Sequence, residues 1–162
     1  MKKIHHLVLW PALAVILLDQ ITKAVVMDRL RAHASSVPVI RGFFNLVHVR
    51  NRGMAFGLMN SPHGDLSFYI LLFASLGAVV FILVWTFKFK EKGNLVPLGL
   101  GLILGGAVGN LIDRLRFHEV IDFLDFHLGA YHWPAFNVAD SAITVGTFMV
   151  AIGLMFLNKR RD

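Results

Sequence analysis

Four long apolar stretches dominate the pattern of hydrophobic and polar positions along the chain. Leu66 to Phe87, Gly93 to Ile112 and Ser141 to Asn158 contain no Asp, Glu, Lys or Arg. The remaining stretch, Leu7 to Met27, is interrupted by Asp19, Gln20 and Lys23. About 20 mostly apolar residues are enough for a helix to cross the hydrocarbon core of a membrane. The pattern therefore predicts an all-α membrane protein with four transmembrane helices, at about 7–27, 66–87, 95–112 and 137–157.

The composition supports a membrane protein and excludes several other classes. Apolar residues make up 56% of the 162 residues and charged residues 16%, against about 45–50% and about 25% in soluble domains. The mean hydropathy of +0.65 excludes a disordered chain, which needs low hydrophobicity. Because the chain has no cysteine, disulfides, thiolate metal sites and a cysteine nucleophile are excluded. The net charge is +6, but the basic residues flank the apolar stretches, which indicates membrane lipid as the partner and not nucleic acid.

The connecting segments predict how the spans are arranged. An even number of spans puts both termini on one side, and the three lysines within 88–94 favour the cytoplasm for that side. We expect one integral membrane domain over 1–162, with extracytoplasmic segments at about 28–65 and 113–136. A cleaved signal peptide is not expected, because Asp19-Gln20 follows the first apolar run where small residues would mark the cleavage site.

The first extracytoplasmic segment, 28–65, is too long to be only a connector. Leu46 to Arg50 alternates in part, with Val47 and Val49 on one side, which predicts a strand. We therefore expect a small extracytoplasmic β-rich cradle and lid between spans 1 and 2. In the third span, the glycines of 99–106 favour close helix packing over phosphate binding.

Polar side chains inside the apolar stretches are candidate functional residues, because an ionisable group costs about 2.5–3.5 kcal/mol to insert. Asp19 and Lys23 lie four residues apart, on one face of a helix. They could instead form a structural ion pair with Lys23 reaching the interface. Five further candidates lie at the end of the third span and at the start of the fourth: Asn110, Asp113, Arg114, Asn137 and Asp140. These five could instead be residues of helix ends in the headgroup layer or N-caps.

Two further carboxylates, Asp122 and Asp125, lie in the second extracytoplasmic segment among Ile, Phe and Leu residues. Two carboxylates held close together cannot both ionise, so such a pair shares a proton. Its ionised member can take a proton from water while the other protonates a leaving amine. This is the chemistry of an aspartic peptidase, and it needs neither a metal nor a cofactor.

Other chemistries fit the residues less well. Ser141 lacks the glycine pattern of a nucleophile elbow, although a dyad with Lys23 is conceivable. His118-Glu119 resembles half of a zinc-peptidase motif, but Asp122 stands where the second histidine belongs. Two other functions stay open. One is a small proton-coupled transporter, in which the buried polar residues relay protons, although no internal repeat supports it. The other is a non-catalytic assembly factor, in which they join helices.

Five short motifs follow one another along nearly the whole chain. They are Asp19-Gln-Ile-Thr-Lys23, Asn51-Arg-Gly-Met-Ala-Phe-Gly57, Gly105-Gly-Ala-Val-Gly-Asn-Leu-Ile-Asp-Arg114, Val120-Ile-Asp-Phe123 and Phe136-Asn-Val-Ala-Asp-Ser-Ala-Ile143. Together, and in this order, they closely resemble the motifs of lipoprotein signal peptidases, the type II signal peptidases of bacteria. Met54 departs from the pattern, since a small residue is common there in the family.

The resemblance implies an intramembrane aspartic endopeptidase of the bacterial inner (cytoplasmic) membrane, with its active site near the outer leaflet. Its substrate would be a prolipoprotein whose cysteine already carries diacylglycerol, cut just before that cysteine, and the cyclic peptide globomycin would block it. Asp122 and Asp140 match the catalytic dyad of the family. From geometry alone, Asp125 and Asp113 remain rival partners. The residues expected to support the dyad or bind substrate are Asp19, Lys23, Asn51, Gly53, Asn110, Arg114 and Asn137.

The aromatic residues and glycines of the first extracytoplasmic segment suggest how the substrate lipid is covered. We hypothesise that 39–59 is a mobile lid that excludes water, with Phe43, Phe44, Met54 and Phe56 above the lipid. We expect a monomer without metal or other cofactor, whose partners are membrane lipid and diacylglyceryl prolipoproteins, with no nucleic acid.

Overall fold

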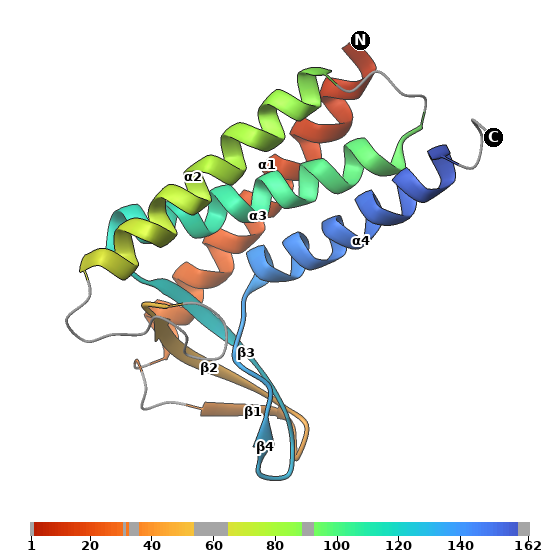
Figure 1. The fold of residues 1–162 in the computed structure, drawn as a ribbon. Coiled ribbons are helices and arrows are strands. Elements are labelled where there is room, and N and C mark those ends of the chain that lie inside the picture. Colours follow the sequence, from red (N-terminus) through yellow and green to blue (C-terminus); the bar gives the residue numbers. More distant parts are fainter. Residues whose placement is uncertain (1, 31, 33–35, 54–64, 89–92, 159–162) are drawn as a thin grey trace.

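The computed structural model describes residues 2–30, 32, 36–53, 65–88 and 93–158. Four long helices form a bundle, and a small sheet lies at one end of it (Figure 1). In chain order the elements are α1 (Lys2–Arg29), β1 (Ser36–Ile40), β2 (Phe44–Asn51), α2 (Asp65–Lys88), α3 (Leu95–Phe117), β3 (Val120–Leu128), β4 (Tyr131–His132) and α4 (Val138–Asn158).

The four predicted spans are confirmed as helices long and apolar enough to cross a membrane. The boundaries agree closely for α2 and α4, but α1 begins at Lys2, before the predicted start at 7, and α3 continues past the predicted end at 112 to Phe117. It ends where His118 adopts a left-handed conformation with φ 61° and donates its N–H to the carbonyl oxygen of Arg114, a common way to close a helix. Asp113 and Arg114 therefore lie within α3 and not in the following segment.

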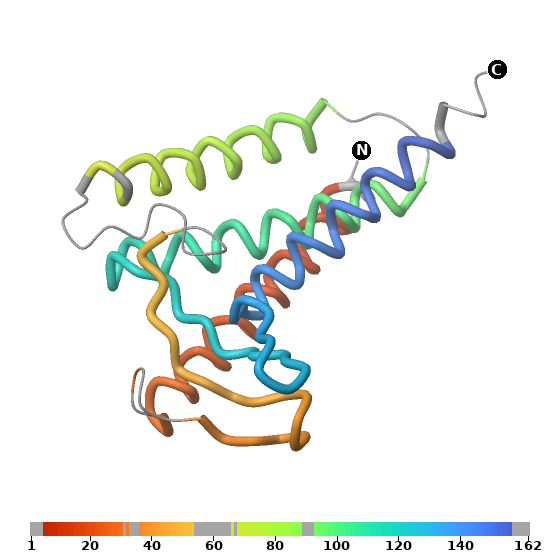
Figure 2. Tube along the Cα trace, turned by 60° about the horizontal axis from the view of Figure 1, so that its bottom comes forward, coloured from red at the N-terminus to blue at the C-terminus, as the bar shows by residue number. Residues whose placement is uncertain are grey.

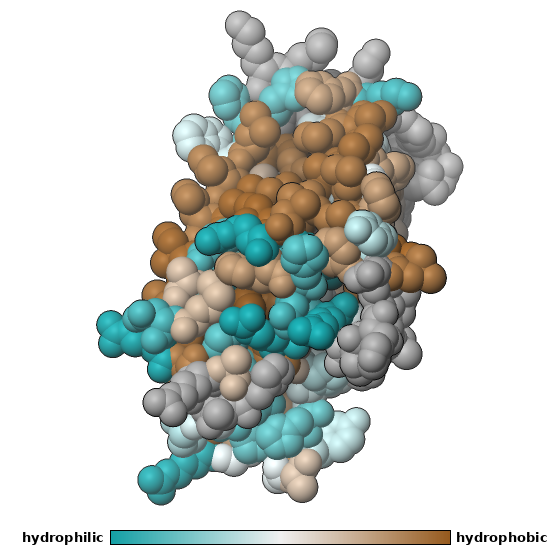
Figure 3. All heavy atoms as spheres, turned by 90° about the vertical axis from the view of Figure 1, so that its left-hand side faces the viewer, coloured by the Kyte–Doolittle hydropathy of each residue, from teal (hydrophilic) through white to brown (hydrophobic). Residues whose placement is uncertain are grey.

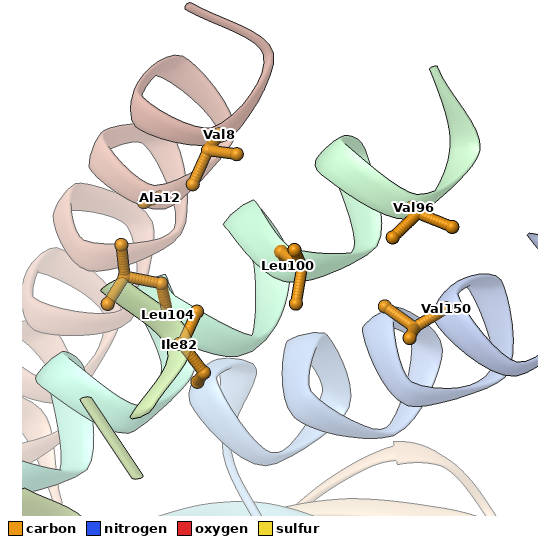
Figure 4. Packing of buried hydrophobic residues seen from close by; sticks show 7 residues of the cluster. All are labelled: Val8, Ala12, Ile82, Val96, Leu100, Leu104 and Val150. Atoms are coloured by element: carbon orange, nitrogen blue, oxygen red, sulfur yellow. The ribbon is translucent and has the colours of Figure 1, made fainter. Parts of the chain in front are cut away.

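All four helices contribute to one apolar core, with α3 at its centre. In Figure 2, α3 lies between α2 on one side and α1 and α4 on the other. The buried side chains of this core are packed together in Figure 4; they are Val8, Ala12, Ile82, Val96, Leu100, Leu104 and Val150.

Glycines on α3 let its neighbours approach to backbone distance. A Cβ at Gly101 would lie 2.5 Å from the carbonyl oxygen of Val8, and one at Gly105 would lie 2.7 Å from that of Ala12. A Cβ at Gly106 would collide with the carbonyl oxygen of Ala139 on α4. The prediction that these glycines serve close helix packing is confirmed, and the approach brings polar groups of α1 and α4 to the same end of α3.

The sheet is antiparallel, in the order β1-β2-β3-β4. β2 confirms the strand predicted at 46–50, and its register sets Asn51 opposite Val120 and Val49 opposite Asp122. We expect the sheet to lie wholly in the segment between spans 1 and 2, and this expectation is wrong. β3 and β4 come from the segment after α3, where the apolar and polar residues of 120–128 do not alternate as in a half-buried strand.

The segment hypothesised as a lid is mostly strand where the structure describes it. Residues 39–53 belong to β1, a turn and β2 with its end. Phe44 stacks on Phe126 with ring centroids 4.7 Å apart, and Phe43 meets the same ring edge-on at 5.5 Å. These two rings therefore pack against Phe126 of β3, while Phe43 stays 43% exposed; that they cover a lipid stays a prediction. Met54 and Phe56 lie outside the described residues.

The surface follows the same division between bundle and sheet. In Figure 3, hydrophobic residues gather over the helices, and hydrophilic residues gather at both ends. The start of α1 and the end of α4 lie at one end of the bundle, and the sheet lies at the other (Figure 1). The fold is therefore that of a four-helix membrane protein with a small sheet at one end.

Candidate active site

A pocket of about 510 Å³ opens where the sheet meets α3 and α4. Six of the nine residues expected at the site line it, and they come from the end of β2, from α3, from β3 and from α4. They are Asn51, Gly53, Asn110, Arg114, Asp122 and Asp140. The other three, Asn137, Asp19 and Lys23, are buried and reach the site through hydrogen bonds.

Asp122 enters the pocket from β3 and is only 2% exposed. The side-chain amide of Asn137 donates to its Oδ1 at 2.8 Å, and that of Asn51 donates to its Oδ2 at 2.9 Å. Burial, and next the charge of Asp140, raise the pKa of Asp122 to about 7, although the two amide donors and Lys23 oppose the rise. This carboxyl therefore exchanges its proton near neutral pH.

Asp140 lies in the first turn of α4 and shares a partner with Asp122. The Asn110 amide donates to its Oδ1 at 2.8 Å. The backbone N–H of Asp140 donates to Oδ1 of Asn137 at 2.9 Å, and that of Asn137 donates back to Oδ2 of Asp140 at 3.3 Å. This reciprocal pair caps the start of α4. Asn137 is thus both the N-cap and a donor to Asp122, so the two interpretations of this residue do not compete.

A charged cluster lies behind the pocket and is almost completely buried. Lys23 Nζ is 2.8 Å from Oδ2 of Asp19 and 2.8 Å from Oδ2 of Asp113. Asp19 also accepts the backbone N–H of Ala139 at 2.9 Å, so a residue of α1 helps to cap α4. The side-chain amide of Gln20 donates to both carboxylates, at 3.2 Å to Asp19 and 2.9 Å to Asp113.

The remaining predicted residues shape the rim of the pocket. Asn51 accepts the backbone N–H of Gly53 on its Oδ1 at 2.9 Å, which leaves its amide N–H groups to face Asp122. Arg114 contacts the hydroxyl of Ser75 on α2 and the carbonyl oxygen of Asn110, each at 3.4 Å. The guanidinium group thus links α2 to the helix that carries Asn110.

The rival carboxylates have other partners. Asp125 accepts a hydrogen bond from the Asn45 amide at 2.9 Å and pairs with Nδ1 of His132 at 2.8 Å. Burial raises its pKa, but these two hydrogen bonds outweigh burial and leave the pKa of Asp125 below its usual value. Asp113 is held by Lys23, and also accepts the backbone N–H of Ile121 at 3.2 Å. Neither carboxylate lines the pocket.

Some lining residues were not anticipated. Residues 133–136 form one wall, and Phe136 is bound by its backbone to Leu124 of β3. Aromatic residues around Pro134 were the only sign of this wall in the sequence. Ser141 also lines the pocket, but its hydroxyl donates to the carbonyl oxygen of Asn137 at 2.9 Å, and Lys23 is occupied elsewhere, so no Ser–Lys dyad forms. Among the described residues, no three His, Asp or Glu side chains are grouped as ligands for a metal ion.

Comparisons with solved structures show the fold. Two solved structures, each described as a bacterial membrane enzyme determined by the in meso method, superpose on the chain. The one at 2.3 Å resolution has a TM-score of 0.82 and 27% identity, covering 94% of this chain and 90% of that chain. The one at 1.9 Å resolution has a TM-score of 0.77 and 29% identity, covering 90% of each.

Comparisons of sequence show the family. A lipoprotein signal peptidase of Desulforapulum autotrophicum is 49% identical over 149 residues, 91% of this chain and 90% of that protein. Those of Syntrophus aciditrophicus and Geobacter sulfurreducens are each 43% identical, over 100% and 99% of both chains. The family described as Signal peptidase (SPase) II matches residues 11–156. The chain therefore belongs to the signal peptidase II family, a family of bacterial membrane peptidases that process lipoproteins.

Proposed function

We propose that this protein is an aspartic endopeptidase that removes signal peptides from diacylglyceryl-modified prolipoproteins, cutting just before the lipidated cysteine. One observation carries the aspartic mechanism. Asp122 and Asp140 come from different elements, line the same pocket, and are both hydrogen-bonded to Asn137. The charge of Asp140 also raises the pKa of Asp122, and two carboxylates whose charges repel each other are suited to hold one proton between them.

The shared proton defines the chemistry. The ionised carboxylate takes a proton from a water molecule as the water oxygen attacks the carbonyl carbon of the scissile peptide bond. The protonated carboxyl then donates its proton to the leaving nitrogen as the C–N bond breaks. The products are a new carboxylic acid on the signal peptide and a free amine on the cysteine. Since the pKa of Asp122 is about 7, Asp122 is suited to carry the shared proton at neutral pH.

The apolar part of the pocket lining suits a lipidated substrate. Phe136, Ile143 and Val145 give this part of the pocket an apolar surface, which is a suitable surface for an acyl chain. The dyad lies at the sheet end of the bundle. With the termini in the cytoplasm, that end faces the outer leaflet of the bacterial inner membrane, where a signal helix leaves the bilayer. We propose that the enzyme acts there as a monomer, without a metal or cofactor.

Cleavage by matched variants tests the proposal. The purified protein in lipid is given a diacylglyceryl-modified prolipoprotein, and products are identified by mass. We expect wild type to cut before the lipidated cysteine. We expect Asp122→Asn and Asp140→Asn to lose at least about 10⁴-fold of kcat, the lower end of the loss when one member of a catalytic unit is removed. Asp125→Asn is the matched control, because Asp125 lies on the same strand with its own amide donor, and it should retain cleavage.

Each other outcome has a definite meaning. Cleavage that survives Asp122→Asn but is lost in Asp125→Asn would keep the mechanism and replace one partner. A folded wild-type protein that cuts no lipidated substrate would overturn the peptidase, and proton flux in vesicles would then test the transporter.

A further inference from the structure

The role of the buried Lys23 follows from the atoms that surround its ammonium group. Lys23 is 1% exposed, and Asp19 and Asp113 are 0% and 1% exposed. Three oxygens lie within hydrogen-bond distance of Nζ: Oδ2 of Asp19 and Oδ2 of Asp113, each at 2.8 Å, and Oδ1 of Asn110 at 3.0 Å. An ammonium group has three N–H donors and no acceptor. Each donor therefore has one partner, and none is left over.

The third of these partners leads to the dyad. Asn110 turns its Oδ1 toward Lys23, so its Nδ2 faces the other way and donates to Oδ1 of Asp140 at 2.8 Å. The side-chain amide of Asn137 also donates to Oδ1 of Asn110, at 3.3 Å. This hydrogen bond favours the same orientation of the Asn110 amide. If the Asn110 amide turned over, an NH₂ group would face the ammonium and an oxygen would face the carboxylate, which are both repulsive contacts.

We propose that Lys23 is a positioning residue, which fixes the orientation of the Asn110 amide and thereby supplies Asp140 with a hydrogen-bond donor. This inference rests on the proposed function, since it assigns the buried cluster a part in catalysis as well as in folding. Asp19 and Asp113 hold the ammonium in place from two sides. The net formal charge of these three groups is −1 when all are ionised, so the lysine alone does not neutralise the cluster.

The obvious test removes the donors and keeps the shape. Lys23→Met has a side chain of similar length and no N–H group. With the lipidated prolipoprotein as substrate, we expect kcat to fall by about 10²-fold, as for a misplaced catalytic group, while KM changes less than twofold because Lys23 does not line the pocket. Lys23→Gln keeps an N–H donor for Oδ1 of Asn110, and should retain more of kcat than Lys23→Met.

A double-mutant cycle isolates the route through Asn110. If Lys23 acts by orienting that amide, then in the Asn110→Ala background Lys23→Met should lower kcat by less than twofold, because there is no amide left to orient. A loss of kcat that stays as large in the Asn110→Ala background would overturn the inference.

Two further variants keep the test decisive if Lys23→Met folds poorly. The double variant Lys23→Met with Asp113→Asn keeps the formal charge of the cluster at −1, and should still lose kcat about 10²-fold. Leu100→Ala is the control for destabilisation alone, because Leu100 lies in the apolar core and does not line the pocket. We expect it to lower Tm without changing the site. If the charge-balanced variant resembles Leu100→Ala, with a lower Tm and kcat within twofold of wild type, Lys23 is only a scaffold. Cleavage that persists in Asp140→Asn would instead refute the proposed function.

Discussion

The side-chain amide of Asn51, at the end of β2, affects the pKa of Asp122. Burial and the charge of Asp140 raise the pKa of this carboxyl to about 7, whereas the hydrogen bond from Asn51 lowers it. Above pH 7 the pair loses the proton that it needs for the leaving amine, so we expect kcat/KM to fall as the pH rises through about 7. Asn51→Ala removes a donor to the ionised form, and should therefore move this alkaline limb to higher pH.

The matched control for this shift lies on the same strand. Asn45 donates to Asp125 at 2.9 Å, just as Asn51 donates to Asp122 at 2.9 Å. Asn45→Ala should leave the alkaline limb of the kcat/KM profile where it is in wild type. If both variants shift the limb equally, the titrating group is not Asp122.

Asp125 contributes to the acid stability of the sheet. Its pKa lies below the usual value because His132 and Asn45 outweigh the effect of burial. A carboxyl with a lowered folded-state pKa stabilises the fold above its unfolded pKa of about 4, and this stabilisation is lost as the pH falls further. We expect Asp125→Asn to lower Tm at pH 6 and to lower it less at pH 3, measured by thermal unfolding in detergent. An equal effect at both pH values would show that charge is not the cause.

At the scale of elements, α3 is the helix that sets the site, because its glycines fix the distance to α1 and α4. A Cβ at Gly105 would lie 2.7 Å from the carbonyl oxygen of Ala12 and 2.7 Å from the Cβ of Val15. Backbone cannot give way as a flexible side chain does, so Gly105→Ala should destabilise the bundle by about 1–3 kcal/mol, the usual cost of overpacking.

Gly77 on α2 is the control for this substitution. A Cβ there would meet nothing within 4 Å, and alanine is favoured over glycine in a helix by about 1 kcal/mol. Gly77→Ala should therefore leave Tm unchanged or raise it, whereas Gly105→Ala lowers it. A drop in Tm for both would mean that the close approach of α1 is not what makes Gly105→Ala destabilising.

At the scale of the whole molecule, hydropathy predicts the four helices because a membrane span needs a long apolar run. The polar residues of the site are also visible, since Asp19 and Asn110 are costly in such a run. Contacts between distant segments are not visible. Nothing local indicates that Asp19 caps α4 at Ala139, because that contact depends on how α1 and α4 pack on α3.

The choice between Asp122 and Asp125 depends on the secondary structure of residues 120–128. Side chains three apart share a face of a helix, but they point to opposite faces of a strand. When the strand over residues 120–128 is not known, both carboxylates are possible partners of Asp140. A strand assignment would have separated them, since only one of the two can face the pocket side of the sheet.

The orientation of the molecule in the membrane can be tested because the chain has no cysteine. Tyr131 is 77% exposed at the sheet end, and Lys88 is exposed at the end of α2, toward the start of α1 (Figure 1). With the termini in the cytoplasm, a membrane-impermeant maleimide should label Tyr131→Cys in intact spheroplasts, and Lys88→Cys only after permeabilisation. The wild-type chain provides an unlabelled blank. The reverse pattern would place the sheet and the dyad in the cytoplasm, where a signal peptide emerging at the outer leaflet could not reach them.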